Sequence, residues 1–305
     1  MPLRSLKTCE TKQAHKMKLE VPGKTYLFGE YSVLLGGAAI GLATQPCFQI
    51  TYQDSAATSV QFHPESPAAR YLAKHGKSVS VSLLDPYLLG GFGRSTAEYW
   101  AAVIPDLLTV PRDFHSLLAE YKSLHLGSGI DLAFQYFGSI CLADPTQGFF
   151  QTFSWHFENL DFFIISTGNK IATHEHLKTL DLDSLKDLPV LSEKLTHVFA
   201  ANKEFEFLSL MKQWCALLIE HKLIHADSLE MKAKLEAFES IKLAKPCGAL
   251  GADVILVFFA KSQKETVKNF LYQNDYLIQA HSSDLAPGVF AQLEILKAEF
   301  LNGAV

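Results

Sequence analysis

The sequence predicts an α+β protein built from two packed units. The chain has 305 residues, of which 48% are hydrophobic and 19% charged, so it is long enough to bury more than one core. Its first half contains mainly short strand-like runs between turns, whereas long helical stretches follow after about residue 155. We therefore expect one unit at residues 17–155, a second at 156–305, and a flexible arm at the polar residues 1–16.

The charge and the cysteines of the chain limit its class. The net charge of -5 argues against a surface that binds nucleic acid or an acidic membrane, although small anionic ligands remain possible. The apolar runs are too short or too glycine-rich to span a bilayer. The five cysteines are scattered and form no C-x-x-C, which favours reduced thiols. We expect a cytoplasmic protein, a monomer or homodimer, without nucleic-acid or membrane partners.

Hydrophobic periodicity gives the expected elements in order. In the first half we expect strands at 18–22, 25–34, 38–52 and 58–63, a short helix at 67–74, a helix from about 95 to 104, a helix around 114–121 and an apolar segment at 132–137. In the second half we expect strands at 160–166, 254–259 and 276–281 and helices at 184–224, 228–243 and 263–272.

A glycine-rich turn, Gly90-Gly91-Phe92-Gly93, precedes the helical run that begins with Arg94-Ser95-Thr96-Ala97. Three glycines within four residues remove the Cβ atoms that would keep a phosphate away from the backbone. Ser95 and Glu98 fit a capping box, so free N–H groups would point out of the helix start toward an anion. An ordinary capped helix after a tight turn is the alternative interpretation.

Three charged residues have positions that suit catalysis. Lys24 lies between a Pro-Gly turn and a strand-like run, Glu120 borders the apolar face of the helix around 114–121, and Asp131 follows Gly127-Ser128-Gly129. Each also has a structural explanation: a solvated lysine, a surface glutamate and a helix cap. The residues alone do not decide between these alternatives.

Three stretches together resemble the motifs of the GHMP superfamily of small-molecule kinases, in nearly the whole chain from Met17 onward. Pro22-Gly23-Lys24 through Gly29-Glu30-Tyr31-Ser32-Val33 is similar to the first motif in its mevalonate-pathway form, P-G-K-x-x-x-x-G-E-[HY]-x-V. Gly91 to Ala97 resembles the phosphate loop G-L-G-S-S-A-A. Lys245 to Asp253 resembles K-x-[ST]-G-A-G-G-G.

Further segments strengthen the resemblance. Ser128-Gly129-Ile130-Asp131 is similar to the S-G-x-D that contains the family's catalytic aspartate, and Glu120 precedes Asp131 by the eleven residues typical of the family's magnesium glutamate. Residues 167–173 resemble the T-G-x-P-A-S-T turn of phosphomevalonate kinases. Arg94 replaces a serine of the family pattern, and Leu250 and Ala252 replace glycines. We expect the added side chains of these residues to narrow the groove.

The resemblance implies a two-domain GHMP kinase fold, with a ribosomal protein S5 domain 2-like N-terminal domain and a ferredoxin-like C-terminal domain. It also implies ATP and Mg²⁺ as cofactors and a small-molecule acceptor. The residues that it assigns are Asp131 and Lys24 for catalysis; Gly90, Gly91, Phe92, Gly93, Arg94, Ser95, Thr96 and Ala97 for ATP; Ser95 and Glu120 for the metal; and Lys24, Glu30, Tyr31, Arg94, Ser128, Lys170, Gly248 and Ala249 for the acceptor.

The most similar branch is that of the phosphomevalonate kinases, because Gly29-Glu30-Tyr31 and Gly251-Ala252-Asp253 match its forms of the first and third motifs. An acceptor that already has a phosphate needs a cation nearby, and Arg94 and Lys170 are the candidates. A mevalonate kinase is the alternative. A ligand sensor without turnover, and a diphosphomevalonate decarboxylase, are weaker alternatives.

Overall fold

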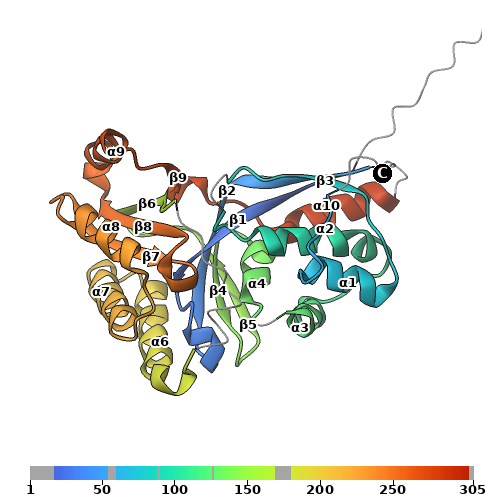
Figure 1. The fold of residues 1–305 in the computed structure, drawn as a ribbon, viewed down its shortest axis with the longest axis horizontal. Helices are drawn as coiled ribbons and strands as arrows, with labels where there is room; N and C mark the ends of the chain where they lie inside the picture. The colour runs from blue at the N-terminus through green and yellow to red at the C-terminus, as the bar shows by residue number, and fades with distance from the viewer. Residues whose placement is uncertain (1–16, 54–59, 88–89, 126, 169–179, 302–305) are drawn as a thin grey trace, which may run out of the picture.

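Two antiparallel sheets, each with its own helices, make up the computed structural model of the chain (Figure 1). The structure describes residues 17–53, 60–87, 90–125, 127–168 and 180–301. The first sheet is formed by residues before 154 and the second by residues after 159. The expected α+β class is therefore confirmed, and the expected change of pattern near residue 155 falls between the two sheets.

The first sheet has the strand order β1-β2-β4-β5, with β3 also paired to β2. Its strands are β1 (Lys18–Phe28), β2 (Ala39–Tyr52), β3 (Val81–Leu84), β4 (Ile140–Asp144) and β5 (Phe149–Phe153). The pairing register of β1 with β2 shifts between Val21 and Gly23, and such an irregularity changes the direction of the side chains that follow it. Lys24 is the first side chain after this shift.

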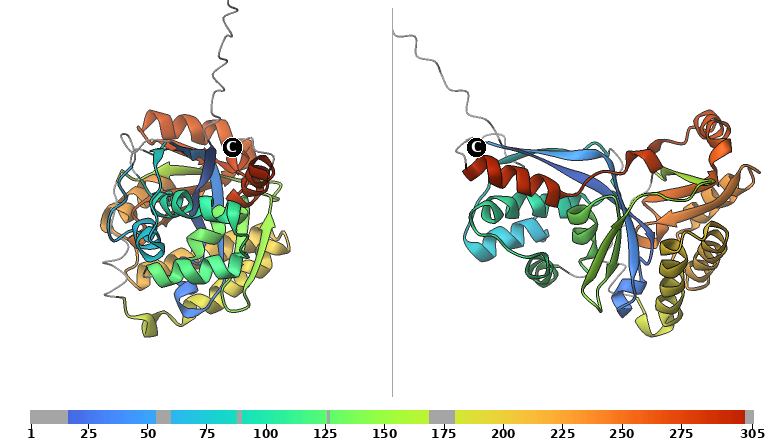
Figure 2. Two further views of the ribbon diagram at one scale, coloured as in Figure 1. Left: turned by 90° about the vertical axis from the view of Figure 1, so that its right-hand side faces the viewer. Right: turned by 180° about the vertical axis from the view of Figure 1, so that it is seen from behind.

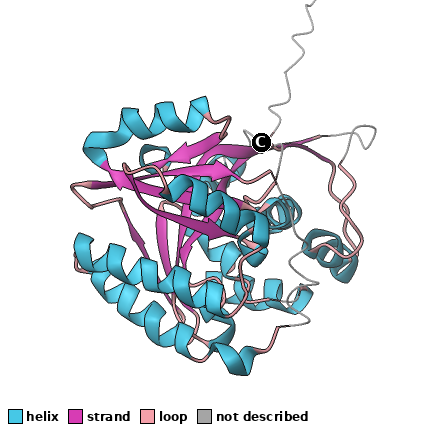
Figure 3. Ribbon diagram, turned by 60° about the vertical axis from the view of Figure 1, so that its left-hand side comes forward, coloured by secondary structure: helices cyan, strands magenta, loops and turns pink. Residues whose placement is uncertain are grey.

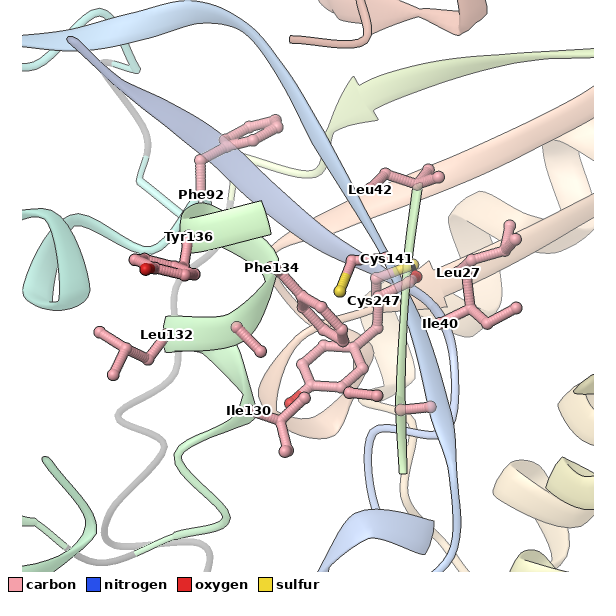
Figure 4. Packing of buried hydrophobic residues seen from close by; sticks show 14 of the residues in the cluster. Leu27, Ile40, Leu42, Phe92, Ile130, Leu132, Phe134, Tyr136, Cys141 and Cys247 are labelled. Atoms are coloured by element: carbon pink, nitrogen blue, oxygen red, sulfur yellow. Dashed lines mark hydrogen bonds between the residues drawn. The ribbon is translucent and has the colours of Figure 1, made fainter. Parts of the chain in front are cut away.

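Four helices lie in the same half of the molecule as the first sheet: α1 (Pro67–His75), α2 (Arg94–Thr109), α3 (Phe114–Leu124) and α4 (Ile130–Phe137). α4 packs directly against β1, β2 and β4. Figure 4 shows Ile130 and Phe134 on one side of α4, toward Cys141 of β4, and Leu132 and Tyr136 on the opposite side. This packing fixes the rotation of α4 about its axis and thus the direction of its polar side chains.

The second sheet has the order β7-β8-β6-β9 and is covered on both faces. Its strands are β6 (Leu160–Ser166), β7 (Ile241–Cys247), β8 (Val254–Ala260) and β9 (Ile278–His281). Alternate residues of β8 join different cores: Leu256 and Phe258 pack with residues of the first sheet, whereas Val257 and Phe259 form a separate cluster. A strand buried on both faces explains the uninterrupted apolar run of β8.

Helices of the second half form two groups (Figure 3). α6 (Asp187–Ala200) and α7 (Glu204–Glu220) supply side chains to the larger core, and α8 (Ala226–Glu236) and α9 (Lys264–Gln273) supply side chains to the separate cluster. Trp214 of α7 contacts Phe28 at the end of β1. The second half is therefore joined to the first sheet by packing as well as by the chain.

The last helix, α10 (Val289–Leu301), differs from the predicted division into domains. It packs against β1, α2 and α4, beside the first sheet, as both views in Figure 2 show. Gln292 of α10 receives a hydrogen bond of 2.8 Å from the backbone of Glu20 in β1. The final helix of the unit predicted at 156–305 consequently packs with the elements of the first half of the chain.

Four expected elements are corrected by the structure. The strand expected at 25–34 ends at Phe28 as part of β1, and a 3-10 helix follows at Ser32–Leu35. The helical stretch expected at 184–224 is divided into α6 and α7. The helix predicted at 228–243 ends at Glu236, because the segment from Ile241 onward pairs with β8 as strand β7. In the strand predicted at 58–63, the described residues 60–63 form no strand. In the described part of the chain, no helix has the length and apolar character needed to cross a membrane.

Candidate active site

The lysine of the first motif and the aspartate of α4 form an ion pair. Lys24 Nζ lies 2.8 Å from Asp131 Oδ2, and their side chains are 13% and 33% exposed. The backbone of Lys24 is fixed against the glycine-rich turn, because its N–H donates a hydrogen bond of 2.9 Å to the carbonyl of Phe92. A lysine and an aspartate more than a hundred residues apart in sequence thus meet at one partly open position.

Asp131 lies in the first turn of α4, where the helix dipole favours a negative charge. The helix is preceded by Gly129 with a left-handed backbone, and no side chain caps it, so Asp131 does not act as the cap. The phenol of Tyr26 interacts with the side chains of Asp131 and Ser128. Burial, together with the charge of Asp131, raises the pKa of Tyr26 well above its usual value, so the phenol stays protonated as a donor.

The glycine-rich turn leads into α2 as predicted, but not through a capping box. α2 begins at Arg94, its N-cap is Gly93 with φ of 85°, and no side-chain cap is present. Ser95 is therefore the second helical residue and is exposed, while Glu98 accepts a hydrogen bond of 3.0 Å from Arg94. An uncapped helix start with an exposed hydroxyl suits a phosphate better than a capped one would.

The close approach of three segments explains the glycines of this loop. A Cβ atom on Gly93 would lie 2.8 Å from Cγ of Lys24, and one on Gly91 would lie 2.7 Å from Cβ of Asp253. Both glycines have positive φ, and the side chains of Lys24 and Asp253 pack against the loop where the Cβ atoms would lie, so the loop forms a tight cradle against the first and third motifs. Such a cradle is what ATP phosphates need, so the residues present fit this ligand.

The remaining residues assigned to ATP are divided between surface and core. Phe92 is 1% exposed and stacks on Tyr87, so its backbone alone faces the loop. Thr96 and Ala97 are buried, and the Thr96 hydroxyl lies 2.9 Å from that of Tyr121. Ser95 is thus the hydroxyl of this turn that remains open to a ligand.

The structure does not bring Glu120 to Ser95. Its carboxylate is bound by Lys74 at 3.0 Å, His75 at 2.8 Å and Arg112 at 2.7 Å. These partners belong to the last turn of α1 and the segment after α2, whereas Ser95 lies at the start of the 16-residue α2. The magnesium role of Glu120 stays a prediction, and these contacts argue against it.

Burial raises the pKa of Glu120, but the hydrogen bonds from His75, Arg112 and Lys74 outweigh it and lower the pKa to about 2. Among the described residues, no three His, Cys, Asp or Glu side chains gather as a metal cluster. A magnesium ion at the phosphate loop would therefore take most of its oxygen ligands from the nucleotide and water, which is common for this ion. The oxygens of Ser95 and Asp131 are of the type that it accepts.

Glu30 and Tyr31, assigned to the acceptor, instead connect the two halves of the molecule. Glu30 Oε1 lies 2.6 Å from Lys245 Nζ of β7, and the lysine side chain is fully buried. Burial by itself would lower the pKa of Lys245. Cys247 and the charge of Glu30 raise this pKa by more than burial lowers it, so the pKa of Lys245 lies above its usual value. The Tyr31 hydroxyl accepts a hydrogen bond of 3.1 Å from the backbone N–H of Leu250.

The third motif forms a tight turn between β7 and β8. Residues Ala249–Gly251 make a short 3-10 segment in which Leu250 has φ of 51°, a conformation that costs a non-glycine residue free energy. The end of this turn approaches the phosphate loop, because a Cβ atom on Gly91 would lie 2.7 Å from Cβ of Asp253. Gly248 in turn lies against Asp253, and the acceptor role of Gly248 and Ala249 stays a prediction.

The two cations proposed for an acceptor phosphate are placed differently. Arg94 Nε lies 3.0 Å from Glu98 and Arg94 Nη1 lies 3.4 Å from Asp85, with the arginine side chain 47% exposed. Lys170 lies outside the described residues. Arg94 is thus at the mouth of the phosphate loop, already paired with two carboxylates.

Sequence reasoning missed the residues that connect the motifs. Gln135 donates to the Pro22 and Gly93 carbonyls, Tyr26 contacts Asp131, and Lys245 pairs with Glu30. A signal existed for Lys245, the first residue of the third motif, and for Gln135, which lies one helical turn after Asp131. No local pattern marks Tyr26.

Comparison with solved structures shows the class of fold. The chain has the GHMP kinase fold, so the predicted resemblance is confirmed at the level of architecture. Neither a known family model nor a curated protein sequence matches the chain.

The particular structures that it resembles act on different acceptors. The Streptococcus pneumoniae phosphomevalonate kinase, in complex with phosphomevalonate and AMPPNP, is 16% identical with a TM-score of 0.68, and 87% of this chain and 99% of that one are covered. The Methanococcus jannaschii mevalonate kinase is 13% identical with a TM-score of 0.62, covering 88% and 98%. The Lactococcus lactis galactokinase is 11% identical with a TM-score of 0.67, covering 90% and 94%.

Proposed function

We propose that this protein is an ATP-dependent small-molecule kinase. The observation on which the proposal rests is the ion pair of 2.8 Å between Lys24 and Asp131, beside the glycine-rich loop that precedes the uncapped start of α2. Phosphoryl transfer needs mainly a phosphate cradle, a cation and a carboxylate that orients the acceptor hydroxyl. Lys24, Asp131 and the loop before α2 are the described residues that support this proposal.

In this proposal Asp131 accepts or orients the proton of the acceptor hydroxyl. Lys24 pairs with that carboxylate and offsets negative charge on the moving phosphoryl group. The buried phenol of Tyr26, which interacts with Asp131, would help Lys24 to orient this carboxylate. A carboxylate that these two residues already orient needs little rearrangement when the acceptor binds.

The phosphate loop would bind the nucleotide. The backbone at Gly91 and Gly93 and the first turn of α2 would bind the phosphates, and the exposed Ser95 hydroxyl would contact the metal that accompanies them. Magnesium, when bound, would neutralise phosphate charge and align the oxygens for transfer. The predicted second ligand, Glu120, would first have to leave three basic partners.

Phosphomevalonate is the acceptor that we favour. The first motif reads Gly29-Glu30-Tyr31 and the third ends in Gly251-Ala252-Asp253, both in the form of phosphomevalonate kinases. Arg94 is half exposed at the mouth of the loop, and exposed ion pairs contribute little free energy. Its guanidinium could therefore exchange a carboxylate for the acceptor phosphate.

Mevalonate is the second candidate, because Arg94 already has two carboxylate partners. An acceptor without a phosphate would need no cation there. The two candidates thus differ in whether the pairs of Arg94 with Asp85 and Glu98 open when the acceptor binds.

A coupled ADP-release assay tests the proposal. The purified protein is given Mg²⁺ and ATP with phosphomevalonate, mevalonate or galactose, and Asp131→Asn serves as the control for contaminating kinases. We expect the highest kcat/KM with phosphomevalonate and a higher KM for it in Arg94→Ala. A higher kcat/KM with mevalonate would transfer the assignment to that acceptor, and ATP binding without ADP release would favour a sensor.

A further inference from the structure

Gln135 connects two loops of the site through a single amide group. It lies on α4, four residues after Asp131, and is completely buried. Its Nε2 donates to the carbonyl of Pro22 at 3.0 Å and to the carbonyl of Gly93 at 3.3 Å. One side chain therefore joins the segment just before Lys24 to the N-cap residue of α2.

The chemistry of these contacts requires a donor at this position. Both partners are carbonyl oxygens, so the NH₂ group of an amide satisfies both, while the reverse orientation of the amide would place three oxygens together. Oε1 of Gln135 is buried and has no hydrogen-bond partner among the described residues. A buried oxygen without a partner is costly, so the two donated bonds are the reason to have an amide here.

The two loops touch each other where Gln135 joins them. A Cβ atom on Gly93 would lie 2.8 Å from Lys24 Cγ and 3.1 Å from Gln135 Nε2. The Lys24 N–H also donates to Phe92, the residue before Gly93. The direction of Lys24 toward Asp131 thus depends on how closely the phosphate loop lies against the first motif.

We propose that Gln135 is a positioning residue, which fixes Lys24 and the phosphate loop relative to Asp131. The inference rests on the proposed kinase function for its effect on turnover, but not for its effect on the loops. Gln135 acts through the Pro22 and Gly93 carbonyls and does not itself face the acceptor, since it is fully buried.

Two variants test this role. Gln135→Met keeps the size of the side chain and removes both donated bonds. Gln135→Glu keeps the shape but sets a carboxylate against two carbonyl oxygens at neutral pH; protonated at lower pH, it can again donate. Gln292→Met is the matched control, because Gln292 also bonds the backbone of β1, at Glu20, but from α10.

The first readout is hydrogen exchange of backbone amides in the segment 90–97, which needs no activity. We expect exchange there to be at least tenfold faster in Gln135→Met than in the wild type and unchanged in Gln292→Met. Unchanged exchange in both variants would overturn the proposal. This result is independent of whether the protein proves to be a kinase.

The second readout is the split between kcat and KM at a temperature where the variants remain folded. We expect kcat to fall tenfold or more in Gln135→Met, and in Gln135→Glu the activity relative to the wild type should rise as the pH falls. If Gln135→Met does not fold, this pH-dependent recovery in Gln135→Glu decides the question. A lowered melting temperature with kcat within twofold of the wild type would reduce Gln135 to a structural role and overturn the proposal.

Discussion

Replacing Asp131 by asparagine separates its chemical role from its structural one. Asparagine keeps the shape of the side chain, but it removes the negative charge that lies 2.8 Å from Lys24. It also removes the negative charge that interacts with the phenol of Tyr26. We expect the phosphate loop to remain intact, because it keeps its own contacts with Lys24 and Gln135.

The expected magnitudes follow from these contacts. Loss of a positioned proton acceptor lowers rates by about 10²–10⁴-fold, so kcat should fall by at least about a hundredfold. The Lys24 ammonium, only 13% exposed, loses its charged partner, which costs about 1–2 kcal/mol of unfolding free energy. Nucleotide binding should change little, because the loop backbone provides it. Single-turnover kinetics, urea unfolding and calorimetric titration of Mg²⁺ and ATP measure the three quantities.

The matched control is Asp106→Asn in the last turn of α2, away from the phosphate loop. Asp106 also pairs with a lysine, Lys77, and accepts a hydrogen bond from Tyr71, so a similar loss of stability is expected without loss of turnover. A fall in kcat below tenfold in Asp131→Asn, equivalent to about 1.4 kcal/mol, would refute the catalytic role. Loss of nucleotide binding would show instead that Asp131 builds the loop.

Three further substitutions test other parts of the structure. Glu120→Gln should leave the magnesium dependence of the rate unchanged and lower the unfolding free energy by about 1.5–3 kcal/mol at pH 7. Because folding lowers the pKa of Glu120 from 4.5 to about 2, this difference in unfolding free energy should disappear as the pH falls from 4.5 to 2. A raised magnesium requirement in Glu120→Gln would restore the metal role. Lys245→Met should cost about 3–5 kcal/mol in urea unfolding by leaving Glu30 buried and unpaired, and adding Glu30→Gln should recover part of that loss; additive losses would contradict this account. Leu250→Gly should stabilise the chain by up to about 1 kcal/mol, since glycine adopts φ of 51° without strain, and a lower melting temperature would show that the leucine side chain contributes more than its strain costs.

The elements with a clear local pattern could be predicted from the sequence. β6 spans Leu160–Ser166 as predicted, and α9 and β8 agree within a residue. The segment Ile241–Cys247 could not be predicted as a strand, because it is extended only through pairing with β8, in which six of its residues have partners. The return of α10 to β1 could not be predicted either, since no local feature specifies packing across the length of the chain.

In the site, spacing predicted proximity well only where the chain between two residues is regular. The eleven-residue step from Glu120 to Asp131 crosses the end of α3 at Leu124 and the irregular residues before α4, so it does not place both carboxylates on one face. Neighbouring residues of a helix differ in direction by about 100°. Tyr121 consequently faces the phosphate loop, and Glu120 faces α1.

The two residues that replace glycines in the third motif have different physical consequences, and neither follows from composition. Ala252 is fully buried, and its carbonyl accepts a hydrogen bond from the Thr167 hydroxyl. Its methyl group therefore fills part of the core and does not narrow the groove. Leu250 is strained but useful, because its N–H donates to Tyr31 and its carbonyl accepts from His225 at 2.7 Å. These bonds connect the turn to the first motif and to the start of α8. The turn therefore keeps the conformation that glycine would allow, because tertiary hydrogen bonds offset the backbone strain of Leu250. We expect nucleotide affinity to depend on the backbone of Gly91 and Gly93 more than on either replacement.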